Sequence, residues 1–159
     1  MSENANWIIT GSVENFRATR ERDFTVQGLK SRHRKTAEKI RPGDRITWYI
    51  TGIKALGATA TVTSEYFEDH TPIWCSDKQK KTEDDYPFRF EIKPDVVLDE
   101  EDLIDAEPVA RQLRHVSKWP EKNWTLAFQG NIRPIDDDDF AIIEDALKEA
   151  SLAPAAAGD

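Results

Sequence analysis

Residues 41–51 read RPGDRITWYIT, a tight turn that leads into a strand with alternating side chains. Pro42 keeps the residue before it out of helical geometry, so a preceding helix has to end here. The apolar positions of the strand are Ile46, Trp48 and Ile50. This period of two is typical of a half-buried strand. We expect those three in the core, and Tyr49 and Thr51 on the opposite face, where they can line a pocket.

Other elements follow on both sides of this strand. Further strands are expected at residues 7–10, 23–28, 55–65, 88–92 and 124–128. Helices are expected at residues 13–20 after the N-cap Ser12, at 31–40, at 109–116, and after Asp136–Asp139. Between them lie a polar loop at 66–85 and an acidic connector at 95–107. Strands scattered among short helices predict an α+β fold with a mixed, curled sheet, and do not distinguish a barrel from an open sheet.

Length and composition indicate one domain. The chain has 159 residues, enough to bury about 70% of its unfolded surface. We assign residues 1–150 to the domain and 151–159 to a frayed tail. The lone Cys75, the lack of a long apolar run and an N-terminus without signal-peptide features predict a cytoplasmic protein away from membranes. We expect a monomer.

The charge is unevenly distributed. The net charge of −8 argues against nucleic acid, because phosphate contacts need Lys and Arg. Between residues 17 and 45, however, ten Lys and Arg accompany four Asp and Glu, a balance of +6 that leaves −14 for the other residues. The asymmetry predicts one face able to meet a polyanion; the alternative is ordinary solvated surface throughout.

Catalytic motifs are absent from the sequence. The histidines lie far apart, at 33, 70 and 115, and no Ser occupies a Gly-x-Ser-x-Gly elbow. Glu68-Asp69-His70 with Cys75 lacks the ligand spacing of a zinc site, and Asp136–Asp139 suit a helix N-terminus. We therefore expect no catalytic residues, no metal and no cofactor.

Aromatic residues are the more informative set. The five tryptophans are Trp7, Trp48, Trp74, Trp119 and Trp124. Aromatic rings with a polar group stack a flat nucleobase and hydrogen-bond its edge. Trp7 and Trp48 lie on predicted strands and are expected in the core. Trp74 lies on a predicted loop, which makes it the first candidate for a ligand contact.

Taken in order, these segments resemble the EVE domain family. The similarity extends from about Trp7 to Leu147 and includes Asn6-Trp7-Ile8-Ile9-Thr10, the stretch at 41–51, and Asn123-Trp124 with Phe128-Gln129-Gly130. The resemblance implies a PUA-like pseudobarrel, related to YTH, PUA and ASCH domains. It also implies a partner that is nucleic acid or a modified nucleoside.

The resemblance further suggests site residues. Thr71-Pro72-Ile73-Trp74 resembles the YTH segment that supplies one tryptophan of an aromatic cage, and Gln27-Gly28 stands where many members have tryptophan followed by Gly or Ser. Trp124 is expected in the pocket wall or the core, and Thr10 and Gly11 offer backbone groups to a base edge. The basic loop and helix offer phosphate contacts through Lys30, Arg32, His33, Arg34 and Lys35.

Together these inferences predict a protein that binds a nucleotide or modified base in DNA or RNA without catalysis. Two alternatives stay open. One is an ASCH-like RNA- or nucleotide-processing enzyme, whose candidate acids and bases are His33, Glu65, Asp69 and His70. The other is an accessory protein that binds a basic partner through its acidic face.

Overall fold

The computed structural model describes residues 4–74 and 85–157, with side chains described as far as Ser151. The strands are β1 (Asn6–Gly11), β2 (Val26–Leu29), β3 (Arg45–Ile50), β4 (Ala55–Val62), β5 (Phe67–Glu68), β6 (Phe88–Val97), β7 (Ile104–Asp105) and β8 (Ile132–Ile135). The α-helices are α1 (Val13–Glu21), α2 (Arg34–Lys39), α3 (Ala106–Ala110) and α4 (Asp137–Ala157). The 3-10 helices are η1 (Ser31–His33), η2 (Glu100–Asp102), η3 (Val116–Lys118) and η4 (Glu121–Phe128).

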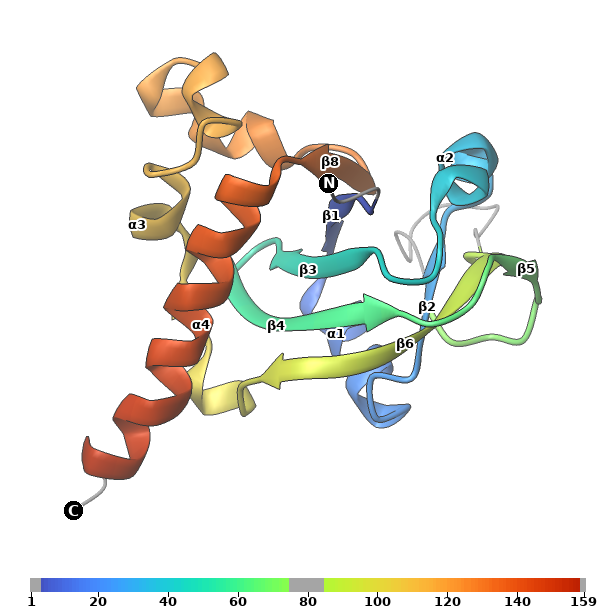
Figure 1. The fold of residues 1–159 in the computed structure, drawn as a ribbon, viewed down its shortest axis with the longest axis horizontal. Helices are drawn as coiled ribbons and strands as arrows, with labels where there is room; N and C mark the ends of the chain where they lie inside the picture. The colour runs from blue at the N-terminus through green and yellow to red at the C-terminus, as the bar shows by residue number, and fades with distance from the viewer. Residues whose placement is uncertain (1–3, 75–84, 158–159) are drawn as a thin grey trace.

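The strands form one mixed, curled sheet in the order β2-β6-β4-β3-β1-β8 (Figure 1). β1 and β3 are parallel, and the other pairs are antiparallel. β6 accounts for the curl, because its first half pairs with β2 and β5 while its second half pairs with β4. The α+β class is confirmed, with a half-barrel of strands surrounded by short helices.

The turn at 41–44 is held by Asp44. Gly43 has φ +97°, which suits the third position of a type II turn after Pro42. The buried Asp44 carboxylate accepts hydrogen bonds from the Ala5 N–H at 2.9 Å and the Trp7 indole at 3.0 Å. The turn is thereby tied to the start of β1, which places β1 beside β3.

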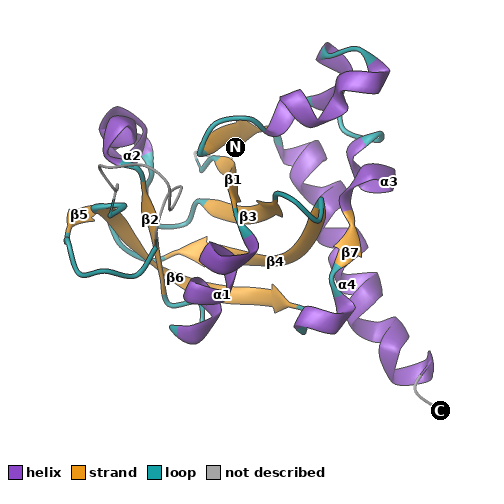
Figure 2. Ribbon diagram, turned by 180° about the vertical axis from the view of Figure 1, so that it is seen from behind, coloured by secondary structure: helices purple, strands orange, loops and turns teal. Residues whose placement is uncertain are grey.

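Two cores lie on opposite faces of the sheet. Along β3, Ile46, Trp48 and Ile50 join the cluster beneath α1, whereas Tyr49 joins the cluster beneath α3 and α4. Figures 1 and 2 show α1 on one face and α3 and α4 on the other. Both faces of β3 are therefore buried, and the expected alternation separates two cores.

The prediction of a strand at 124–128 is wrong. These residues belong to η4, where Trp124, Ala127 and Phe128 are buried at helical spacing against Tyr49 and α4. The closing strand is β8 instead, which the sequence did not indicate because Pro134 interrupts its pattern. β8 is an edge strand of the sheet, where a proline without an N–H is tolerated.

Several predicted boundaries also move. The helix expected at 109–116 is α3, which ends at Ala110 and is followed by turns. The acidic connector contains the end of β6, η2 and β7. α4 extends from Asp137 to Ala157. Within the described residues, no helix combines the length and apolar content needed to cross a bilayer.

Candidate functional site

A small pocket lies where the parallel strands β1 and β3 end. Gly11 lies opposite Ile50 at this edge, and α1 begins immediately after β1, with the Ser12 hydroxyl accepting the Asn15 N–H at 3.1 Å. The described lining consists of Ile9, Thr10, Gly11, Ser12, Asn15, Phe16, Gln27, Trp48, Tyr49, Ile50, Trp74, Tyr86 and Asn131. Six separate segments of the sequence therefore converge beside the N-terminus of one helix.

Trp74 forms part of the pocket wall. Although it follows an irregular segment, its side chain is 2% exposed and its indole donates a 2.8 Å hydrogen bond to Thr19 Oγ1. The Tyr86 ring lies 6.2 Å from it at an angle of 46°. Trp74 is therefore buried in the wall of the pocket, and its contact with a ligand stays a prediction.

Gln27 connects the two tryptophans of the pocket. Its Oε1 accepts the Trp48 indole N–H at 2.9 Å and the Thr19 hydroxyl at 2.9 Å, while its Nε2 donates to the Gly28 carbonyl. Because Thr19 also accepts from Trp74, a continuous chain of hydrogen bonds joins both indoles through one buried amide. The Gln27 carbonyl oxygen is thus engaged by the protein and orients the aromatic wall.

Gly28 is required by packing. A Cβ at this position would lie 2.6 Å from the Tyr86 carbonyl oxygen and 2.8 Å from the Trp74 ring. The wall therefore lies directly against the β2 backbone, and any larger residue would displace it.

The pocket is closed in this conformation. Its volume is about 10 Å³, which holds about one water molecule. Ligand pockets are typically about 300–1,000 Å³. A base therefore enters only when wall side chains move, and Trp74 and Tyr86 are the large ones on irregular segments.

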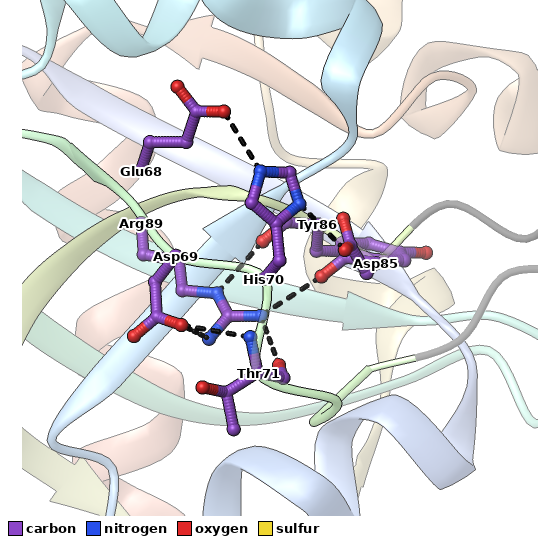
Figure 3. Close-up of polar contacts among 7 residues, drawn as sticks. All are labelled: Glu68, Asp69, His70, Thr71, Asp85, Tyr86 and Arg89. Carbon is purple, nitrogen blue, oxygen red and sulfur yellow. Dashed lines mark hydrogen bonds and ion pairs between the residues drawn. The ribbon is translucent and has the colours of Figure 1, made fainter.

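Arg89 anchors both segments that carry these rings (Figure 3). Its side chain is 1% exposed, and its guanidinium donates to the carbonyls of Tyr86 and Asp85, both at 3.0 Å, and of Thr71. The guanidinium also lies 5.1 Å from the centroid of the Trp74 ring, within cation–π range. Burial lowers the pKa of Arg89, opposed by the nearby carboxylates of Asp69 and Asp85.

His70 links the same two segments at the surface. Its Nδ1 lies 2.8 Å from Asp85 and its Nε2 lies 2.8 Å from Glu68. The hydrogen bonds to Glu68 and then Asp85 raise the pKa of His70, because they favour the charged imidazolium, which can donate to both at once. Figure 3 shows this link beside the Arg89 guanidinium.

The expected ligand residues separate into two groups. Trp74, Gln27, Tyr49, Thr10 and Gly11 line the pocket, and Gly28 supports its wall. Thr51 lies in a neighbouring cleft, and Trp124 is buried in the core beneath α4, where it meets Tyr49 edge-on at 6.3 Å. Thr51 and Trp124 therefore do not line the pocket with Trp74.

The phosphate candidates also separate. The Lys30 N–H donates to Asn131 Oδ1 at 2.9 Å, and its ammonium lies 6.0 Å from the Tyr86 ring, so Lys30 lies at the pocket rim. The other candidates, Arg32, His33, Arg34 and Lys35, belong to η1 and α2. Arg34 lies over the Phe88 ring and pairs with Glu38 at 3.4 Å, which places α2 beside the β2–β6 pair.

The comparisons with known proteins now identify the family. The EVE domain model matches residues 5–146. The chain belongs to the EVE domain family. The UPF0310 protein PH1033 of Pyrococcus horikoshii is 26% identical over 151 residues, covering 89% of this chain and 97% of that protein.

Solved structures with a similar fold include YTH domains. The YTH domain-containing protein mmi1 in complex with RNA has a TM-score of 0.65 at 14% identity, covering 98% of this chain and 92% of that one. The Pho92 YTH domain in complex with m6A has a TM-score of 0.65 at 14% identity, covering 93% and 85%. At this identity the comparison shows that this EVE domain has a YTH-like fold.

Sequence reasoning missed several polar residues of the pocket. In this EVE domain the Asn15 amide donates to the Tyr86 hydroxyl at 3.2 Å, and the 4% exposed Asn131 joins β1 to the Lys30 backbone. Asn15 lies inside α1 and Asn131 follows a glycine turn, so neither position has a local sequence signal. Trp48, expected only in the core, lines the pocket as well.

Proposed function

We propose that this EVE domain binds a nucleotide or modified nucleobase of DNA or RNA, and does not catalyse a reaction on it. The observation that carries the proposal is the pocket between Trp48, Trp74 and Tyr86, with the amides of Asn15 and Asn131 beside it. Gln27 holds the indole of Trp48 in place. Flat aromatic walls stack any base, and amide groups hydrogen-bond its edge.

The structural neighbours support the same class of ligand. The mmi1 YTH domain is in complex with RNA, and the Pho92 YTH domain is in complex with m6A. A small alkyl group on a base would add apolar contact in an aromatic pocket, which is a physical basis for selecting modified bases. Lys30 at the rim supplies a cation for a flanking phosphate.

Trp74→Ala tests the proposal. We expect the affinity for the preferred nucleoside to fall at least tenfold, because a stacked base is worth about 1–3 kcal/mol and about 1.4 kcal/mol is a tenfold change. Calorimetric titration of adenosine, N6-methyladenosine and other methylated nucleosides measures the change. Because Trp74 is buried, Trp74→Phe, which keeps most of the ring surface, is measured beside it and should lose less affinity.

Trp119→Ala is the matched control. Trp119 is half-buried between η3 and η4 and does not belong to the described pocket lining, so its removal should leave nucleoside affinity unchanged. Equal affinities for wild type and folded Trp74→Ala would contradict the proposal. Wild-type turnover of labelled RNA or nucleosides that is abolished by His33→Ala would instead support an enzyme.

A further inference from the structure

A second cleft adjoins the base pocket. It is about 410 Å³ and is lined, among the described residues, by Thr10, Tyr49, Thr51, Gly52, Lys54, Thr125, Phe128, Gln129 and Gly130. Thr10 and Tyr49 also line the base pocket, and they are register partners on β1 and β3. One pair of neighbouring residues therefore divides a closed pocket from an open one.

Backbone hydrogen bonds hold the residues on either side of the pocket and the second cleft. The Thr10 N–H donates to the Asn131 carbonyl at 2.9 Å, and the Asn131 amide also holds the Lys30 backbone. At the far end, the Ala106 N–H donates to the Lys54 carbonyl at 2.9 Å, which ties the β3–β4 turn to α3. Lys30 thus lies at one end of a track that crosses Thr10, and the exposed Lys54 lies at the other.

Charge distinguishes this track from the other depressions of the molecule. Although the net charge is −8, neither the described lining of the base pocket nor that of the second cleft includes Asp or Glu. Two depressions elsewhere do contain carboxylates, from Asp136 and Asp139 in one and from Glu121 in the other. The described linings themselves therefore place no negative charge against a phosphate, and Asp105 acts on Tyr49 from outside both linings.

We propose that the second cleft binds the nucleotide next to the base held in the pocket, so that the ligand is a single-stranded segment of nucleic acid and not a free nucleoside. This inference rests on the proposed function. The backbone runs from Lys30 past Thr10 to Lys54, where the ammonium meets a phosphate. The Thr51, Thr125 and Gln129 side chains line the cleft around the neighbouring sugar and base.

The test compares two probes on the same variants. The first is the nucleoside that binds best in the panel above, and the second is a six-nucleotide single strand that carries the same base at its third position. For Lys54→Ala, we expect unchanged nucleoside affinity and weaker oligonucleotide binding. The slope of log K against log salt should fall by about 0.7, the value of one single-strand phosphate contact. Lys148→Ala, which removes an exposed lysine on α4, is the control and should change neither quantity.

A second variant tests the shape of the cleft without changing charge. Thr51→Tyr places a ring in the cleft and should weaken the oligonucleotide while leaving the nucleoside unaffected. If Lys54→Ala and Thr51→Tyr both bind the oligonucleotide as tightly as the wild type does, the proposal for the second cleft is wrong. The proposed binding of a base in the pocket is not affected by that result. If wild type binds neither probe, the proposed function fails, and the second cleft fails with it.

Discussion

At the scale of single residues, Arg89 explains how an irregular segment forms one wall of a pocket. Its donors reach backbone carbonyls on both sides of residues 75–84, which lie outside the described residues. A planar guanidinium has five donors in a fixed fork, so one side chain can hold Thr71 on one segment and Asp85 and Tyr86 on the other. The positions of Trp74 and Tyr86 therefore depend on one buried side chain at the start of β6.

Replacing Arg89 should loosen this wall. Arg89→Met leaves buried carbonyls without a donor, and we expect the free energy of unfolding to fall by at least about 1–3 kcal/mol, the cost of one such group. Arg89→Lys keeps the charge but not the fork, so it should restore only part of the stability. Urea denaturation measures both variants. A lysine variant as stable as wild type would show that charge alone suffices.

His70 makes the same link sensitive to pH. Because Glu68 and Asp85 raise its folded pKa above the unfolded value of about 6.5, its contribution to stability is fully present below that value and is lost as pH rises through the folded pKa. We expect the difference in melting temperature between wild type and His70→Gln to be largest at pH 5.5 and to vanish at alkaline pH. Asp69 also interacts electrostatically with this imidazole but does not hydrogen-bond to it. Asp69→Asn is therefore the control for the effect of a nearby negative charge alone. A difference that does not vary with pH would rule out titration of His70.

At the scale of elements, the pocket depends on how β2 approaches the wall. Gly28 pairs with Arg89 across β2 and β6, so the residue that admits the Trp74 ring lies beside the residue that fixes it. Gln27, one position earlier, accepts a hydrogen bond from the Trp48 indole and is linked to the Trp74 indole through the Thr19 hydroxyl. Two consecutive residues of one short strand thus set the spacing and the orientation of the aromatic wall.

Gly28→Ala should destabilise the protein by about 1–3 kcal/mol, the usual cost of overpacking, because its Cβ would lie within 3 Å of a backbone carbonyl and a ring. Gly11→Ala is the matched control. Its Cβ would meet its nearest atom, the Asn15 Cβ, at 3.8 Å, so stability should change by no more than about 0.5 kcal/mol. Thermal unfolding followed by tryptophan fluorescence compares the two. Equal stability of both variants would show that the wall yields at little cost.

At the scale of the whole molecule, the basic residues of the segment at 17–45 lie in different surroundings. The basic segment at 17–45 does not form a single ring around the pocket: Lys30 lies at the rim, whereas Arg17 pairs with Glu100 and Arg45 with Glu144 and Asp95. The described linings of the pocket and the second cleft contain no carboxylates. Counting charges along the sequence reveals the asymmetry, but it does not show which residues line the pocket and the second cleft.

Local physical chemistry made much of this fold predictable from the sequence alone. The turn at 41–44 is marked by a proline followed by a glycine, and apolar side chains alternate with period two along β3. Ser12 caps α1 because its hydroxyl accepts a hydrogen bond from the N–H of Asn15, three residues later. Each signal lies within one element, so its neighbours along the chain are enough to read it. The family followed from the order of such segments.

Only the tertiary structure decided which residues meet. Trp74 reaches Thr19 across 55 residues and Asn15 reaches Tyr86 across 71, and no local pattern encodes those distances. Residues 124–128 show the same limit, since their apolar side chains suit a strand but their burial against Tyr49 and α4 favours η4. Propensities of short segments are small beside the free energy of burying tryptophan and phenylalanine, so packing decided that element and completed the pocket.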